Sequence, residues 1–153
     1  MGWSDERSTP LKMIGLVHDI GKISIPVEIL TKPIALSPLE MALIREHVQA
    51  SYDILKNVPF PIPVAEIIWQ HHERIDGSGY PRGLKGDSIL PEAKILAVAD
   101  TLESMSTHRP YRPAKSIDAA IKEIQDNRGK RYDPDVVDAM LRLLKHKCYQ
   151  HPV

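Results

Sequence analysis

The sequence of 153 residues has one cysteine, no excess of either charge and no long apolar run. The single thiol, Cys148, cannot form an internal disulfide, which fits a reducing compartment. The 20 Lys and Arg residues balance the 20 Asp and Glu residues, so no broad basic surface favours a nucleic-acid polymer as partner. No stretch approaches the roughly 20 apolar residues of a membrane helix, and no basic-then-apolar leader opens the chain. We therefore expect a cytoplasmic protein without a membrane segment.

The distribution of polar and apolar residues predicts one all-α domain. Residues 1–10 are polar and aperiodic, which predicts a tail or a cloning remnant ahead of a domain over 11–153. Apolar residues then recur at three- and four-residue steps, and no convincing alternating pattern of a strand appears. The expected architecture is a bundle of about five to six helices.

Several helix starts are marked by capping residues. Ser37 and Glu40 form an S-x-x-E capping box before a helix expected over about 38–57. His47 falls within the apolar stripe of that helix and should point inward. Further helices are expected over 64–73, from Pro91, from Ser116 to Gly129, and from Pro134. Residues 76–87, DGSGYPRGLKGD, hold four glycines and predict a loop built for close backbone approach.

Six side chains that commonly bind metals are grouped in four places along the chain. They are His18, Asp19, His47, His71, His72 and Asp100. A single histidine on an apolar helix face is more often a hydrogen-bonded core residue, but the six together favour a divalent-metal site of a hydrolase. A buried Asp100 would cost several kcal/mol unless a cation compensated it. Asp19 is the natural bridge between two metals.

The motifs around these residues resemble those of the HD-GYP branch of the HD phosphohydrolases. The matching segments are His18-Asp19-Ile20-Gly21-Lys22, His71-His72-Glu73, Asp76 to Pro81, Glu92 to Asp100, Arg109 to Arg112 and Tyr132-Asp133-Pro134. The resemblance covers about residues 11–145. It implies a helical domain that hydrolyses the bacterial second messenger cyclic di-GMP to pGpG or GMP, with two or three divalent ions, iron or manganese.

The same resemblance implies roles for individual residues. It makes His18, Asp19, His47, His71, His72 and Asp100 metal ligands, with Asp19 also catalytic. Lys22 would neutralise the scissile phosphate or help the leaving oxygen. Glu73 would either orient a histidine or serve only as a helix-terminal charge.

Four further residues are implied on the substrate side. Gly79 and Tyr80 would shape the substrate site, and Tyr80 could stack or form a hydrogen bond. Arg109 and Arg112 would bind phosphate oxygens, because a guanidinium group can pair with two of them at once. The competing interpretation of the two arginines is surface ion pairing. His108, His146 and His151 show no partner pattern and are taken as surface residues.

One part of the family pattern is missing. The family has a further histidine on a helix about thirty residues before the His-Asp pair, whereas only 17 residues precede His18 and none is a histidine. The resemblance is therefore to a domain that is incomplete at its N-terminal side.

Three explanations of the missing part stay open: a fragment of a longer protein, a shortened copy that binds cyclic di-GMP or partner proteins without cleavage, or a homodimer whose second chain supplies the missing helix. The expected partners are an upstream sensor or receiver domain or a diguanylate cyclase. An HD phosphohydrolase for another nucleotide is a third functional hypothesis, which the GYP loop disfavours.

Overall fold

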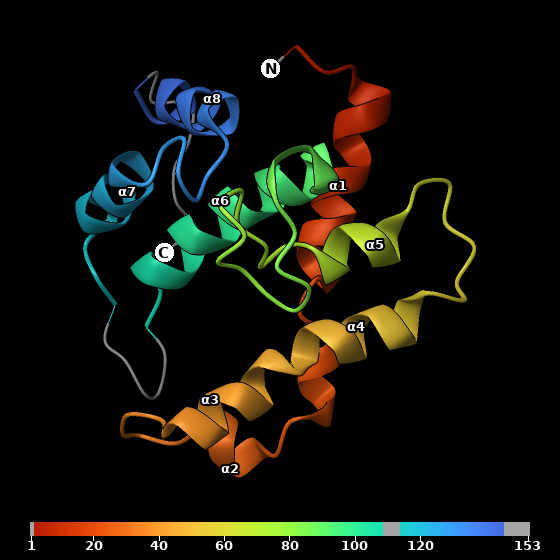
Figure 1. Cartoon of the computed structure of the whole chain (residues 1–153), viewed down its shortest axis with the longest axis vertical. Coiled ribbons are helices and arrows are strands. Elements are labelled where there is room, and N and C mark those ends of the chain that lie inside the picture. The colour runs from red at the N-terminus through yellow and green to blue at the C-terminus, as the bar shows by residue number, and fades with distance from the viewer. Residues whose placement is uncertain (1, 109–113, 146–153) are drawn as a thin grey trace.

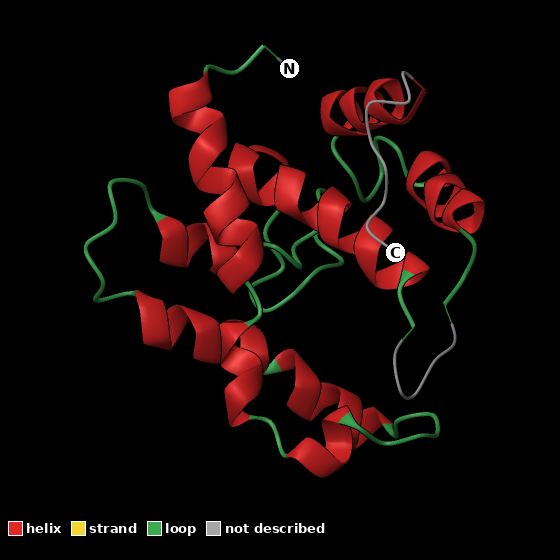
Figure 2. Cartoon of the chain, turned by 180° about the vertical axis from the view of Figure 1, so that it is seen from behind, coloured by secondary structure: helices red, strands yellow, loops and turns green. Residues whose placement is uncertain are grey.

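The computed structural model describes residues 2–108 and 114–145 of the chain. Figure 2 shows that these residues form helices and loops, with no strand among them. In the described part, β-type backbone pairing is limited to two isolated β-bridges, one between Asp76 and Lys85 and one between Arg128 and Tyr132. The helices are α1 (Asp5–Val17), η1 (Ile20–Ser24), α2 (Val27–Leu30), α3 (Pro38–Arg45), α4 (His47–Leu55), α5 (Val64–Trp69), η2 (Gly86–Ser88), α6 (Pro91–Ser106), α7 (Ile117–Asp126) and α8 (Pro134–Lys145). The all-α class is confirmed, with more helices than expected.

Helix α6 is the centre of the molecule, because it contributes to two hydrophobic cores (Figure 1). Ala93 and Leu96 of its first half belong to the same core as buried residues of α1, α4 and α5. Its second half packs Val98 and Leu102 against α7 and α8. Asp100 therefore lies on the element that joins the two halves of the molecule.

The helix expected over 38–57 is in fact two helices. Ser37 caps α3 as predicted: its hydroxyl accepts from the Glu40 N–H at 3.3 Å, and the Glu40 carboxylate accepts from the Ser37 N–H at 2.7 Å. The helix is interrupted at Glu46, and α4 begins at His47. The apolar period continues across the interruption, which explains why the pattern suggested a single helix. The short α2 carries no buried residue and left no amphipathic signal.

Part of the segment expected to be a polar tail is helical, because α1 begins at Asp5 and runs through Pro10. A proline in a helix interior costs one hydrogen bond, so packing has to compensate for it. Ile14 is fully buried, and Arg7 on the polar first turns pairs with Glu92 of α6 at 2.8 Å. The domain boundary itself stays a prediction.

Two predicted helices end earlier than expected. The helix that starts at Val64 ends at Trp69, so His71 and His72 follow it in a turn. Helix α7 ends at Asp126, three residues before Gly129, whose φ of 73° supplies the left-handed conformation of the next turn. Among the described residues, no helix has the length and apolar character needed to cross a membrane.

Candidate metal centre

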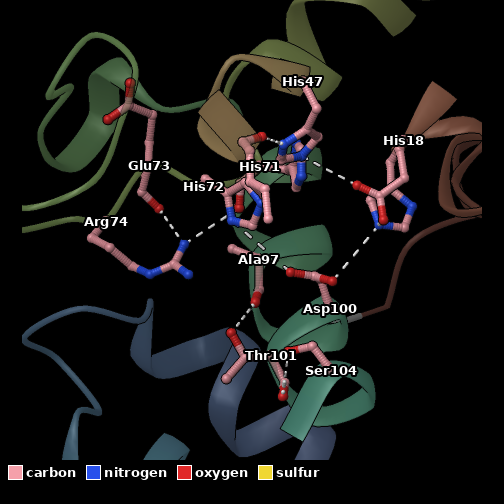
Figure 3. Close-up of polar contacts among 12 residues, drawn as sticks. His18, His47, His71, His72, Glu73, Arg74, Ala97, Asp100, Thr101 and Ser104 are labelled. Atoms are coloured by element: carbon pink, nitrogen blue, oxygen red, sulfur yellow. Dashed lines mark hydrogen bonds and ion pairs between the residues drawn. The ribbon is translucent and has the colours of Figure 1, made fainter. Parts of the chain in front are cut away.

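The fold brings the six predicted ligand residues together from four segments; Figure 3 labels all of them except Asp19, which lies beside His18 and His47. His18 and Asp19 follow the last residue of α1, His47 is the first residue of α4, the two adjacent histidines follow α5, and Asp100 lies within α6. The Nε2 atom of His47 lies 3.2 Å from Oδ1 of Asp19. The Nε2 atom of His18 lies 3.4 Å from Asp19 Oδ2 and 3.7 Å from Asp100 Oδ1.

Three of the histidines are oriented by the same kind of hydrogen bond, to the backbone carbonyl oxygen three residues earlier. The Nδ1 atoms of His18, His47 and His71 lie 2.7, 2.6 and 2.5 Å from the carbonyl oxygens of Gly15, Ile44 and Ile68. A carbonyl oxygen can only accept, so each Nδ1 carries the proton and donates it. The Nε2 atoms of all three rings are buried, and none has a hydrogen-bond partner.

Buried nitrogen atoms without a hydrogen-bond partner are costly unless something binds them. Ligand atoms of His47, His71 and His72 lie within 4.8 Å of one another, and so do those of His18, Asp19 and His71. The two groups overlap at His71, which is fully buried. Imidazole and carboxylate are common ligands of divalent metals in hydrolases, so these residues could hold a metal. The donor set fits a metal-dependent site.

The carboxylates of the centre are held ionised by their neighbours. Burial raises the pKa of Asp19, but its contacts with His47, His18 and Lys22 outweigh this effect and leave the pKa well below its usual range. Burial also opposes the ionised form of Asp100, whose pKa is nevertheless lowered, chiefly by its interaction with the nearby His18 ring. Both side chains therefore present negative charge to the imidazoles at neutral pH.

Burial keeps the two adjacent histidines neutral. It lowers the pKa of His71 to about 4 and the pKa of His72 well below its usual value. Burial acts in the same direction on His18, but its interactions with the carboxylates of Asp100 and Asp19 raise its pKa overall. A neutral imidazole offers a lone pair to a metal, whereas an imidazolium does not.

The His18-Asp19 segment is locked against α4 by Gly21. A Cβ atom at Gly21 would lie 2.1 Å from the His47 carbonyl oxygen and 2.5 Å from the Ser51 backbone nitrogen. Only glycine allows this approach without a backbone shift. The fully buried Ser51 hydroxyl accepts from the Gly21 N–H at 2.8 Å and donates to the His18 carbonyl oxygen at 3.1 Å. Lys22, on the same 3₁₀ turn, forms an ion pair with Asp19.

The loop after the two histidines folds back over the centre. A Cβ atom at Gly79 would lie 2.4 Å from the Glu73 Cα atom, so this position also requires glycine. The ring of Tyr80 stacks on that of His72, with centroids 4.7 Å apart and planes 24° apart. The Arg45 guanidinium lies 5.0 Å from the centroid of the Tyr80 ring. Burial raises the pKa of Tyr80 further above its ordinary value, at which the phenol is already protonated at neutral pH.

Comparison with known proteins places this arrangement in a family. The HD domain profile matches residues 1–136. The chain belongs to the HD domain family. The cyclic di-GMP phosphodiesterase of Thermotoga maritima is 44% identical over 147 residues, which cover 95% of this chain and 40% of that protein. The cyclic di-GMP phosphodiesterase response regulator RpfG of Xanthomonas campestris is 42% identical over 144 residues, covering 93% and 38%.

A solved structure shows the same fold. Bd1817, an HDG"Y"P protein from Bdellovibrio bacteriovorus, aligns with a TM-score of 0.71 at 24% identity, over 93% of this chain and 45% of that one. The HD domain match confirms the HD family that the motifs predicted, and this likeness confirms the helical fold. The chain spans 40% or less of the length of the two curated relatives.

Some residues of this HD domain escaped sequence reasoning. Glu73 was expected either to orient a histidine or to be a helix-terminal charge, but its carboxylate accepts from the backbone N–H groups of Arg82 and Leu84. Neither Ser51 nor Arg45 was singled out, because no motif marks a buried hydroxyl or a single surface arginine. Arg109 and Arg112, the predicted phosphate-binding pair, lie outside the described residues.

Proposed function

We propose that this HD domain is a metal-dependent phosphodiesterase that hydrolyses cyclic di-GMP to pGpG or GMP. The observation that carries the proposal is the set of three buried Nε2 atoms without hydrogen-bond partners, grouped beside two ionised carboxylates. Relatives named cyclic di-GMP phosphodiesterases support the choice of substrate. The metals proposed are two or three divalent ions, iron or manganese.

In this proposal the six clustered residues hold the metals. His18, Asp19, His47, His71, His72 and Asp100 are the ligands. Divalent ions bound there would polarise the phosphate and make a water molecule more acidic. Their binding would also satisfy the three buried Nε2 atoms, which the protein itself leaves without partners.

Lys22 and the GYP loop would act on the substrate. The Lys22 side chain is 27% exposed and its ammonium group lies beside Asp19, so that group could move from the carboxylate to a phosphate oxygen or to the leaving oxygen. Gly79 and Tyr80 would form the substrate wall, because the Tyr80 ring stacks on a proposed ligand, His72. Arg109 and Arg112 remain the proposed phosphate-binding arginines.

The test is hydrolysis by the purified chain after anaerobic loading with iron or manganese. Cyclic di-GMP should be converted to pGpG or GMP, and the variant carrying both His18→Ala and Asp19→Ala should be inactive. His108→Ala is the matched control, because His108 is exposed. Absence of turnover above the double variant would overturn the proposal. Tight binding of cyclic di-GMP without turnover would instead favour a catalytically impaired binding module.

A second substrate belongs in the same assay. The 3'3'-cGAMP-specific phosphodiesterase 1 of Vibrio cholerae is 38% identical to the chain over 143 residues, covering 93% of it and 33% of that protein. A kcat/KM for 3'3'-cGAMP well above that for cyclic di-GMP would move the assignment to the mixed dinucleotide while keeping the reaction type.

The proposal extends to location and partners. Cyclic di-GMP is a bacterial second messenger, so we place the domain in the cytoplasm. The response regulator among its relatives favours a receiver or other sensor domain as the regulatory partner. A diguanylate cyclase and a second copy of the chain are the other partners proposed. Size-exclusion chromatography with light scattering would decide whether the chain forms a homodimer.

A further inference from the structure

The carboxylate of Glu73 lies apart from the histidine cluster, although its neighbours in sequence are His71 and His72 (Figure 3). Glu73 is 2% exposed. Its Oε1 atom accepts from the Arg82 backbone N–H at 2.7 Å, and its Oε2 atom accepts from the Leu84 backbone N–H at 3.0 Å. Burying a carboxylate is costly, and two charge-assisted bonds to backbone amides offset that cost. Both donors belong to the loop that contains Tyr80.

The loop is held on both sides of Tyr80. Before it, Gly79 lies against the backbone of residues 72–74, and the Tyr80 N–H donates to the His72 carbonyl oxygen at 3.3 Å. After it, the two amides held by Glu73 fix residues 82–84. Between these two attachments, the Tyr80 ring stacks on the His72 ring. The carboxylate therefore ties the residues that follow Tyr80 to the chain at position 73.

We propose that Glu73 is a positioning residue that fixes Tyr80 over His72 and thereby sets the preference of the site for a large cyclic dinucleotide over a small phosphodiester. This inference rests on the proposed function. A dinucleotide extends beyond the phosphate being cleaved and reaches the Tyr80 wall, whereas a small diester reaches only the metal centre. Loss of the hydrogen bonds between Glu73 and the loop should therefore weaken binding of the dinucleotide and leave the rate of hydrolysis of a small diester unchanged.

Glu73→Gln is the diagnostic substitution because it keeps the size of the side chain. A carboxylate has two accepting oxygens, whereas an amide has one accepting oxygen and an NH2 group that would face a backbone N–H. One of the two loop bonds is therefore lost. Glu66→Gln is the matched control: Glu66 lies on α5 and contacts the Arg82 side chain at 3.7 Å, not the loop backbone.

The first measurement is independent of activity. Amide hydrogen exchange at Arg82 or Leu84, whichever amide loses its acceptor, should be faster in Glu73→Gln than in the wild type, by about tenfold or more for the loss of a bond to a charged group. Glu66→Gln should leave both amides unchanged. Metal content and the unfolding transition of each variant show whether the fold and the centre are retained. Unchanged exchange at both amides in a folded Glu73→Gln protein would refute the anchoring role.

The second measurement tests selectivity. In Glu73→Gln we expect KM for cyclic di-GMP, or its Kd if turnover is slow, to rise about tenfold, with unchanged kcat/KM for methyl p-nitrophenyl phosphate. In a Tyr80→Ala background the same substitution should add no further loss, because Glu73 acts through Tyr80. Equal losses on both substrates, or additive losses in the double variant, would overturn the selectivity role.

If the metal-loaded wild type neither binds nor cleaves a cyclic dinucleotide, the proposed function fails, and the selectivity role fails with it. The exchange measurement would still decide whether Glu73 holds the loop. If the Glu73→Gln protein does not fold, Glu73 is required for the fold itself, and the proposal that it only positions Tyr80 is refuted.

Discussion

The hydroxyl of Ser51 joins Gly21 to α4, accepting from the Gly21 N–H at 2.8 Å while donating to the carbonyl oxygen of His18 at 3.1 Å. Ser51→Ala would leave a buried N–H and a carbonyl oxygen without this partner. We expect a loss of about 1–3 kcal/mol in the free energy of unfolding. Thermal unfolding followed by circular dichroism would measure it. The exposed Ser88→Ala is the control, and equal stability of the two variants would contradict the expectation.

Gly21→Ala should be more harmful than the same change at Gly15. A Cβ atom at Gly21 would lie 2.1 Å from a backbone oxygen of α4, whereas nothing lies within 4 Å of one at Gly15. Overpacking of this kind costs about 1–3 kcal/mol or more. Gly15 lies within α1, where alanine is expected to stabilise by roughly 0.5–1 kcal/mol. Urea denaturation of the two variants should show opposite shifts of the midpoint; a loss of stability from both would mean that contact with α4 is not the cause.

His47→Gln should weaken metal binding without unfolding the domain. The Nε2 atom of His47 faces Asp19 at 3.2 Å, and glutamine cannot place an imidazole nitrogen there. A metal present at about 100 times its Kd stabilises a fold by about 2.7 kcal/mol, so manganese should raise the unfolding temperature of the wild type. We expect a smaller rise for His47→Gln and an unchanged rise for His108→Gln. Metal content per chain, measured by mass spectrometry, gives the same comparison directly.

The capping box of α3 should make stability depend on acid pH. The hydrogen bond from Lys32, followed by those from Ser37, lowers the pKa of Glu40 to about 2 from its ordinary 4.5. Because the folded-state pKa is the lower one, ionised Glu40 stabilises the fold above pH 4.5, and this contribution is lost as the pH falls from 4.5 toward 2. Glu40→Gln should therefore be less stable than the wild type at neutral pH and approach it in acid.

Urea titrations of both proteins across this pH range would check that convergence. The exposed Asp87→Asn serves as the control for a general change of charge. A stability difference between wild type and Glu40→Gln that stays constant from neutral pH to about pH 2 would contradict the assignment.

The clustering of the six histidine and aspartate residues was predictable because these residue types are rare in apolar helices and chemically distinctive. A polar side chain on an apolar helix face is costly to bury without a partner, which marked both His47 and Asp100. The structure brings these two residues into the same cluster. The cap at Ser37 was predictable for a similar reason, since its signal lies within four consecutive residues.

Other features depend on contacts between distant segments, which a local pattern does not contain. The helical start of α1 has a polar sequence and is supported by packing against α6, as the Arg7 to Glu92 ion pair shows. Glu73 was expected either to orient a histidine or to be a helix-terminal charge, but its carboxylate oxygens accept from backbone amides 9 and 11 residues further along the chain. Periodicity and spacing reveal which face is buried, not which backbone group a polar side chain will bind.

The three imidazole tautomers are set by main-chain carbonyl oxygens, each from the residue three positions earlier. Every amino acid supplies that oxygen, so the side chains at Ile44 and Ile68 have no part in orienting the rings. The centre should therefore tolerate exchange of one apolar residue for another at these positions, provided that the helical turn before each histidine persists. For protein engineers, this makes backbone geometry the property to preserve when the centre is transferred to another helical scaffold.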